Sequence, residues 1–238
     1  MIVRVAKTFI ILLLSLPLFA RAADYCVDTG AELASALSGA AASDEDDVIR
    51  LESGAVTLPG AITINSIHGG LSVIGGYSAN CVLIASLSSF STVIAAPGTS
   101  LYLGLGDGDL STLRLNFTGF TAVTFSDQSY GTAVVAGEIR VQRSAFVGNG
   151  TGLSIVTNHH DVRVENSLFV GSTLNDGNIY AGSGLALSAS SISTADISVQ
   201  VINNTASNNR HGFTMVSTKP SLVPVLGNFV TDEFADPA

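Results

Sequence analysis

The sequence is poor in several residue types, and each shortage limits what the chain can be. It has no tryptophan, 2 cysteines, 6 prolines and 10 basic residues among 238, against 19 acidic residues. An acidic surface repels phosphate backbones, so we predict no nucleic-acid partner. Two cysteines without a nearby histidine are too few ligands for a structural zinc ion. We therefore predict no metal site and no cofactor.

Long apolar runs are also missing, except for one at the start. Residues 9–19 form an apolar run of about 11 residues, after Arg4 and Lys7 and before the small-residue pattern Ala20-Arg21-Ala22. This run is shorter than the roughly 20 residues that cross a bilayer. The three parts together are typical of a secretory signal peptide. We predict a signal peptide over residues 1–22 rather than a membrane anchor.

Removal of the signal peptide defines the exported chain. It lowers the net charge from −9 to −9 − 3 = −12, because Arg4, Lys7 and Arg21 are lost. We predict no membrane span in the mature chain, and a location outside the cell, at the cell surface or in the periplasm. The acidic surface also argues against a polyanionic sugar as ligand.

Both cysteines, Cys26 and Cys81, lie in the exported part. An oxidising compartment and an even cysteine count favour a disulfide between them. Such a bond would close a loop of 81 − 26 = 55 residues, which the chain-entropy model values at about 4 kcal/mol. Two buried free thiols are the alternative.

Only one segment has the spacing of a helix, from Thr29 to about Ala42. Thr29 is followed three residues later by Glu32, the pattern of a capping box. Leu33 and Leu37 fall on one helical face. We predict an N-terminal cap over residues 23–47 that contains this helix.

After residue 47 the helical period gives way to short, apolar or β-branched segments bounded by turn residues, which predict strands. These segments are 48–51, 62–64, 71–74, 82–84, 91–94, 101–105, 113–117, 122–125 and 133–135. A sandwich, a barrel and a solenoid would all fit a series of this kind.

A repeated phrase distinguishes among these folds. Residues 139–149 (IRVQRSAFVGN) return 162 − 139 = 23 positions later as VRVENSLFVGS, and again at 199–209 as VQVINNTASNN. The phrases align Ile139 with Val162 and Val199, Val141 with Val164 and Val201, Phe146 with Phe169, Gly148 with Gly171, Ser144 with Ser167 and Asn204, and Asn149 with Ser172 and Asn209. We predict an interior column of Val and Phe, and a column of Ser and Asn at the turns.

A unit of about 23 residues matches one coil of a parallel β-helix, because stacked coils bury a continuous apolar column. The second copy carries about nine extra residues within 173–184, which we place at a turn. The consensus of leucine-rich repeats is absent. We predict an all-β solenoid over residues 48–218 and a C-terminal cap or tail over 219–238, in which 219–230 fold irregularly across the open end.

Three stretches resemble a known family: YCVDTGAELASALSGAAASDEDDVIRL from residue 25, GGYSANC from residue 75 and VINNTASNNRHG from residue 201. They are similar to exported right-handed parallel β-helix proteins of the pectin-lyase-like superfamily, of the bacterial surface or secreted type. The resemblance implies a right-handed β-helix. It does not fix an activity, because this superfamily includes lyases, hydrolases, adhesins and passenger domains.

The catalytic motifs of the family's enzymes are incomplete here. Its polygalacturonases need paired aspartates and a Gly-His-Gly motif, whereas Arg210 precedes His211-Gly212 in this chain. The later acidic residues are scattered, and the repeat does not stack them: Asp161, Glu165, Asp176 and Asp196. We predict no catalytic residues and a structural, adhesive or binding role. The alternative is a carbohydrate-active enzyme with an atypical site, which carboxylates gathered in one groove would favour.

One edge of the solenoid is a candidate ligand site. The inserted turn and the equivalent turn of the next coil together offer amides, an aromatic ring and an arginine, which suit sugar hydroxyls or a peptide loop. These residues are Asn175, Asp176, Asn178, Tyr180, Asn209, Arg210 and His211. The predicted partner is a carbohydrate or a surface protein, and the oligomeric state stays open. We interpret the four histidines, His68, His159, His160 and His211, as solvated turn residues.

Overall fold

The computed structural model describes residues 22–96, 98–127, 137–190, 197–217 and 225–231. The predicted signal peptide, except for its last residue, and the predicted strand 133–135 lie outside these ranges. Within them the chain is mostly β-structure, with one α-helix, α2 (Gly30–Ala41), and the short 3-10 helix η1 (Ala79–Cys81). No helix among these residues is long and apolar enough to cross a membrane.

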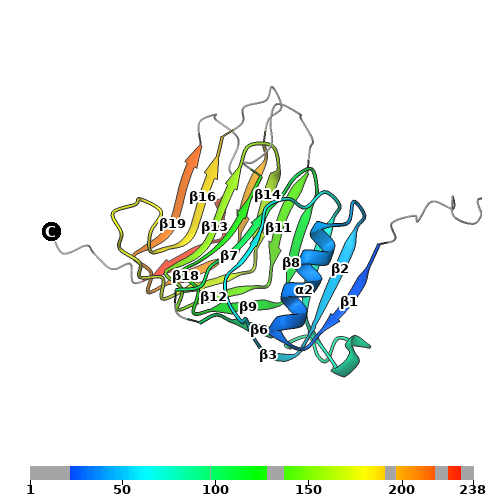
Figure 1. Ribbon diagram of the computed structural model, residues 1–238. Coiled ribbons are helices and arrows are strands. Elements are labelled where there is room, and N and C mark those ends of the chain that lie inside the picture. The colour runs from blue at the N-terminus through cyan, green and yellow to red at the C-terminus, as the bar shows by residue number, and fades with distance from the viewer. Residues whose placement is uncertain (1–21, 97, 128–136, 191–196, 218–224, 232–238) are drawn as a thin grey trace, which may run out of the picture.

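The strands form three sheets in which every described pairing is parallel (Figure 1). Sheet A contains β1 (Asp24–Val27), β2 (Asp47–Glu52), β5 (Leu71–Tyr77), β8 (Leu110–Leu113), β11 (Glu138–Gln142), β14 (Asp161–Glu165), β17 (Val199–Ile202) and β20 (Val225–Leu226). Sheet B contains β3 (Gly54–Thr57), β6 (Ser91–Ile94), β9 (Leu115–Thr118), β12 (Ala145–Val147), β15 (Leu168–Val170), β18 (Thr205–Ser207) and β21 (Phe229–Thr231). Sheet C contains β4 (Ile62–Ile64), β7 (Leu101–Gly104), β10 (Ala122–Ser126), β13 (Thr151–Thr157), β16 (Ser183–Ala189) and β19 (His211–Ser217).

From β2 onward the chain visits sheets A, B and C in turn, and each strand pairs with the strand three elements away. This order is compatible with the parallel β-helix that the repeat predicts. The interval between equivalent positions varies: hydrogen bonds between neighbouring coils span 23 residues at Ser144–Ser167 but 37 residues at Ser172–Asn209. The length of about 23 residues therefore holds for the shortest coils, and insertions at the turns lengthen the others.

The predicted interior column is confirmed. Ile139 pairs with Val162, which pairs with Val199, and all three side chains are buried. The ring of Phe146 stacks between those of Phe117 and Phe169, with centroids 5.1 and 5.2 Å apart. Buried residues alternate with less buried ones along strands such as β2 and β11, and the inward apolar side chains of the three sheets form one core.

The Ser and Asn columns are also confirmed, as ladders of hydrogen bonds at two turns. The amide oxygen of Asn204 accepts from the backbone N–H of Ser167, and its NH₂ group donates to the carbonyl of Val164. Asn209 makes the equivalent bonds to Ser172 and Phe169. The left-handed backbone lies one residue earlier than the amide, with φ of 54° at Asn203 and 56° at Asn208. One residue of each Asn pair therefore adopts the left-handed turn, and the next residue makes the hydrogen bonds to the neighbouring coil.

Helix α2 begins after Thr29, whose capping box with Glu32 is complete. Its buried face, which includes Leu33 and Leu37, packs against the core of the first coils. No larger residue fits at position 30, because a Cβ on Gly30 would lie 1.8 Å from the carbonyl oxygen of Thr57. The predicted disulfide between Cys26 and Cys81 is present, with Cα atoms 5.7 Å apart, and it joins β1 to η1.

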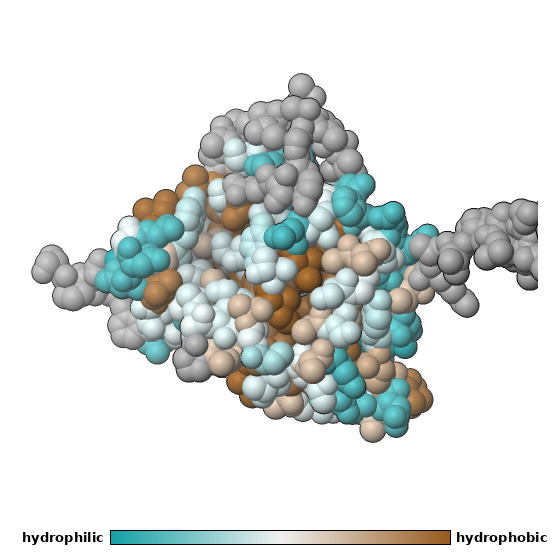
Figure 2. All heavy atoms as spheres, viewed as in Figure 1, coloured by the Kyte–Doolittle hydropathy of each residue, from teal (hydrophilic) through white to brown (hydrophobic). Residues whose placement is uncertain are grey.

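The predicted strand 82–84 is wrong. After η1 this segment forms no strand: Ile84 makes an isolated antiparallel bridge to Tyr77, and the side chains of Val82 and Leu83 are 71% and 69% exposed. Figure 2 shows hydrophobic spheres on this protrusion at the lower right of the view. An apolar run bounded by turn residues predicts a strand only if the run is buried, and here the disulfide holds it outside the core.

Another predicted strand, 113–117, is two strands. Arg114 has a φ of 57°, so the chain turns there from β8 in sheet A to β9 in sheet B. The corner residue bears a long side chain instead of the Gly or Asn that marks most left-handed turns, which is why its sequence reads as continuous.

At the C-terminal end the described residues extend two sheets. Val225–Leu226 pairs with β17, and Phe229–Thr231 pairs with β18. This part of the predicted cap is therefore regular, in contrast to the irregular fold that we expected. Ladder bonds satisfy its backbone better than a loop laid across the strand edge. The domain boundaries themselves stay a prediction.

Candidate functional site

A groove of about 260 Å³ runs across the outer face of sheet A. Its floor is made of small side chains, because Ser72 pairs with Ser111 in the neighbouring strand and Gly70 lies at the start of β5. Arg140 is the next residue in the same row and closes one side of the groove. The small residues leave the outer surface hollow at this point, beside longer side chains.

Acidic residues line the edge of this groove where the strands of sheet A begin. Asp46 accepts a hydrogen bond from the N–H of Gly70 at 2.8 Å, and Asp109 accepts one from the N–H of Glu138 at 2.7 Å. Asp161 repeats the contact with Ser198 in a later coil. These carboxylates cap the exposed N–H groups at the strand starts, and they also place several negative charges along one edge.

The acidic residues are grouped more closely in the structure than the repeat indicates. Glu138 pairs directly with Asp161 across β11 and β14, and Asp46, Asp47, Asp109 and Glu138 line the same groove. Neighbouring strands lie about 4.8 Å apart, so the carboxylates of Asp109 and Glu138 fall within about 10 Å of each other. Asp109 and Glu138 were missed because each stands at a strand start, outside the repeated phrase.

Two polar groups at the groove have unused bonding capacity. The Nε of Arg140 is shielded from solvent and has no hydrogen-bond partner among the described residues, and the same is true of Oδ2 of Asp47. The other oxygen of Asp47 accepts from the N–H of Ala23. Next to Arg140 in the sheet, Arg163 is instead paired with Glu165 at 2.8 Å.

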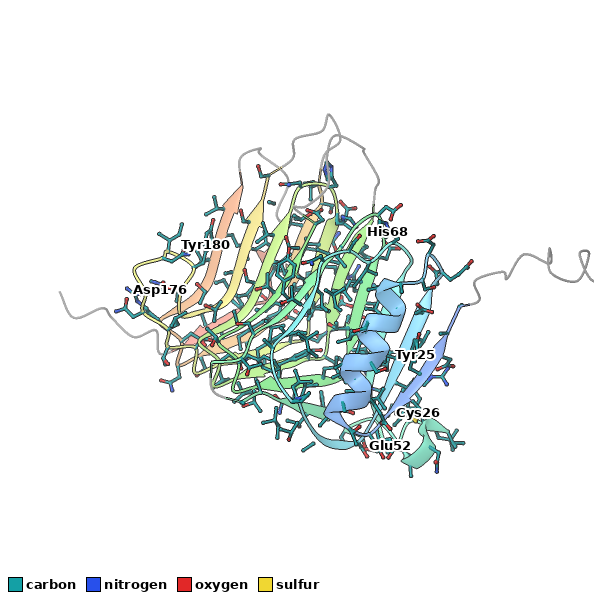
Figure 3. All side chains as sticks on the ribbon, in the orientation of Figure 1. Tyr25, Cys26, Glu52, His68, Asp176 and Tyr180 are labelled. Atoms are coloured by element: carbon teal, nitrogen blue, oxygen red, sulfur yellow. A yellow bond between two sulfur atoms is a disulfide. The ribbon has the colours of Figure 1, made fainter. Side chains whose placement is uncertain are left out.

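The predicted ligand edge is only partly assembled. Arg210 donates to the side-chain oxygen of Asn175 at 2.6 Å, so the two turns do meet. Asp176 and Asn178 instead accept from backbone N–H groups within their own loop, and Figure 3 shows Asp176 and Tyr180 on the protruding turn before β16. Asn209 is buried in the ladder and is withdrawn from any ligand. His211 is half-buried in β19, and ligand binding at this edge stays a prediction.

His160 is not a solvated turn residue. Its side chain is 1% exposed, and its Nδ1 lies 2.8 Å from Oδ2 of Asp127 while its Nε2 lies 3.0 Å from the carbonyl oxygen of Gly108. Both partners can only accept, so both ring nitrogens must carry a proton and the ring is charged. His159 is half-buried, with both ring nitrogens shielded from solvent. The sequence shows no sign of this burial, because the partners come from other coils.

Asp127 holds the centre of this buried cluster. Besides His160, it accepts from the hydroxyl of Thr157 and from the backbone N–H groups of residues 158–160. Burial alone would raise the pKa of this carboxyl, but the hydrogen bonds outweigh burial and lower the pKa to about 2. Burial likewise opposes the charge on His160, and the contact with Asp127 nevertheless raises the histidine pKa above its usual value of 6.5.

A second histidine lies at the same corner, between sheets C and A, but at the surface. Nε2 of His68 lies 2.7 Å from Oγ of Ser66, and its Nδ1 lies 2.8 Å from Oδ1 of Asp107. His68 therefore has defined partners, although it is as exposed as predicted (Figure 3). The bond from His68 lowers the pKa of Asp107.

One group of three potential metal ligands occurs among the described residues, Cys26, Glu52 and Cys81, and both of its sulfurs are used in the disulfide. Comparisons with protein-family models, with curated proteins and with solved structures found no match to this chain. The function therefore has to be argued from the groove and the side chains around it.

Proposed function

We propose that this chain is an exported right-handed parallel β-helix protein, similar to the pectin-lyase-like superfamily, which binds a neutral carbohydrate in the groove of sheet A. The disulfide between Cys26 and Cys81 is consistent with export. The role outside the cell is structural, adhesive or binding, without turnover of the ligand.

The observation that carries this proposal is the position of Arg140 beside a row of carboxylates, Asp109 and Glu138 among them, in one open groove. Sugar hydroxyls both donate and accept hydrogen bonds, so they can satisfy the arginine and the carboxylates at once. The acidic rim and the predicted charge of about −12 favour a neutral ligand over a polyanionic one.

The test is the affinity for neutral oligosaccharides, screened on an array and then measured by calorimetry. Arg140→Gln should weaken binding about tenfold, the equivalent of roughly 1.4 kcal/mol. Arg163→Gln is the matched control, because Arg163 lies in the same row but is paired with Glu165 and does not line the groove. Equal losses in both variants, or no binding by the unmodified protein, would reject the groove as the site.

The second candidate is a carbohydrate-active enzyme with an atypical site. It is favoured by Asp109 and Glu138, since glycoside hydrolysis usually needs two carboxylates within about 10 Å. New reducing ends released from a neutral polysaccharide, and lost in both Asp109→Asn and Glu138→Gln, would establish this alternative. Binding without release supports the non-catalytic role.

A further inference from the structure

Three side chains from two coils meet at the corner between sheets C and A. Ser66 and His68 follow β4, and Asp107 follows β7, which pairs with β4 in the next coil. Oγ of Ser66 lies 2.7 Å from Nε2 of His68, and Nδ1 of His68 lies 2.8 Å from Oδ1 of Asp107. The order is hydroxyl, imidazole, carboxylate, with the imidazole in the middle.

The direction of the proton in each bond follows from the partners. The carboxylate of Asp107 can only accept, so Nδ1 of His68 carries the proton of that bond. In a neutral imidazole Nε2 is then the acceptor, and it takes the hydrogen bond from the Ser66 hydroxyl. This is the arrangement in which a histidine can remove a proton from a serine, with a third group holding the correct tautomer.

The backbone is built to let these groups meet. Gly106 packs against them, and a Cβ there would lie 2.9 Å from both Oγ of Ser66 and Nδ1 of His68. The N–H groups of Gly106 and Gly108 both donate to the carbonyl of Ile67, which lies between Ser66 and His68. The two glycines that flank Asp107 thus hydrogen-bond its loop to the loop that carries His68.

Stability gives little reason for this arrangement. The side chains of His68 and Asp107 are 46% and 49% exposed, so water can replace their hydrogen bonds at small cost. The buried pair of His160 and Asp127 already fastens the same corner two coils further along. An ordered and accessible triad with little structural value suits a reacting group.

We propose that Ser66 is a nucleophile that cleaves carboxylic esters, with His68 as its general base and Asp107 as a positioning residue. The Ser66 oxygen adds to the ester carbonyl carbon, and its proton moves to Nε2 of His68. The bond to the alcohol oxygen then breaks, and the alcohol leaves with that proton. Water, deprotonated by His68, cleaves the acyl–serine bond. One ester and one water give one acid and one alcohol.

The surroundings indicate a small acyl group. Ile67, between Ser66 and His68, is buried in the core, and the other neighbouring positions are Asn65, Gly69, Gly70, Gly106 and Gly108, which offer no apolar wall for a long acyl chain. The site is open to solvent, so an ester that projects from a larger molecule can reach it. The activity does not depend on the groove having a ligand, although Gly70 and Asp109 of the groove each lie two residues beyond members of the triad.

The test is labelling of the full chain with a fluorophosphonate, with the adduct located by peptide mass spectrometry. We expect Ser66 to be labelled on the order of 100-fold faster than Ser86, as expected for general-base assistance. Ser86 is an exposed serine whose hydroxyl lies beside the hydroxyls of Ser88 and Ser89, with no imidazole among its hydrogen-bond partners in the described part of the chain. Hydrolysis of p-nitrophenyl acetate should fall in Ser66→Ala and stay unchanged in Ser86→Ala.

Two further variants separate catalysis from folding. His68→Ala should abolish the fast labelling of Ser66 at an unchanged melting temperature. Asp107→Asn should slow it, and Asp107→Glu should restore part of the rate, which a merely structural carboxylate would not do. Labelling of Ser66 at the rate of Ser86, or labelling unaffected by His68→Ala, overturns the proposal. Neither result bears on carbohydrate binding, which Arg140→Gln tests separately.

Discussion

Two histidine–aspartate pairs occupy the same corner of this protein, and they differ in almost every physical respect. His160 and Asp127 are buried, and His160 donates from both ring nitrogens to groups that can only accept. His68 and Asp107 are exposed, and the second nitrogen of His68 faces a serine hydroxyl. The same two residue types thus make a fixed charge in one place and a candidate base in the other. Burial and the third partner make the difference.

The largest difference should appear when each aspartate is removed. Asp127→Ala leaves a buried imidazolium without its carboxylate partner and removes the acceptor of the N–H groups of Asn158 and His159, whereas the Thr157 hydroxyl and the N–H of His160 each keep another partner. We expect a loss of about 3–5 kcal/mol in the free energy of unfolding. Asp107→Ala should cost less than about 1 kcal/mol, because that pair is exposed. Urea denaturation of both variants measures the two losses, and similar values would remove the distinction between the pairs.

A substitution in the apolar interior gives a reference for the loss of stability expected in Asp127→Ala. Phe169 is fully buried between the rings of Phe146 and Phe213. Phe169→Ala should reduce stability by about 3–5 kcal/mol, through lost burial and the cavity that remains. Exposed Leu168, its neighbour on β15, is the matched control and should lose less than about 1 kcal/mol on mutation to Ala. A loss below about 1 kcal/mol at Phe169 would contradict the stacked register.

The pH dependence of stability should come from the buried pair. The pKa of Asp127 is lowered to about 2, so its contribution is present above its ordinary value of 3.8 and is lost as the pH falls through about 2. The pKa of His160 is raised, so its contribution is present below 6.5 and is lost as the pH rises through the raised value. The pair should stabilise most between about pH 4 and 6.5.

This contribution can be isolated by comparing unfolding curves from pH 2 to 9 for the unmodified protein and for His160→Gln. The acid loss for Asp127 is on the order of 2 kcal/mol. The variant should lose the decline at high pH that belongs to the imidazolium. An identical profile in both proteins would mean that His160 does not carry the charge assigned to it.

The hydrogen-bond ladder should give a smaller loss of stability than Asp127→Ala or Phe169→Ala. Asn204→Ala removes an acceptor for the N–H of Ser167 and a donor to the carbonyl of Val164. We expect a loss of about 1–3 kcal/mol for the groups left unpaired. Asn203→Ala is the control at the neighbouring exposed position, where the cost is that of the left-handed backbone alone, about 1–2 kcal/mol. Hydrogen exchange of the Ser167 amide should accelerate only in Asn204→Ala.

The regular part of the structure could be predicted because it follows from local sequence patterns, such as a phrase that returns in successive coils. The Val and Phe columns, the Ser and Asn ladders, the capping box of Thr29 and the disulfide all follow from spacing or composition, and the structure confirms them. A side chain that must face inward at every coil leaves the same mark each time.

The candidate sites were not predictable in the same way. His68 meets Asp107 across 39 residues, and His160 meets Gly108 across 52. These separations depend on how many residues each turn inserts, and nothing in the repeated phrase fixes them. The groove likewise depends on Ser72 and Ser111 facing outward in neighbouring strands, which only the register reveals.

The contrast between the two histidines can be measured directly by nitrogen NMR of the imidazole rings at neutral pH. We expect His160 to carry protons on both ring nitrogens. In the neutral form of His68 we expect the proton on Nδ1, which faces Asp107, and we expect Nε2 to accept the hydrogen bond from Ser66. A neutral His160, or a His68 whose proton resides on Nε2, would contradict the roles assigned to both pairs.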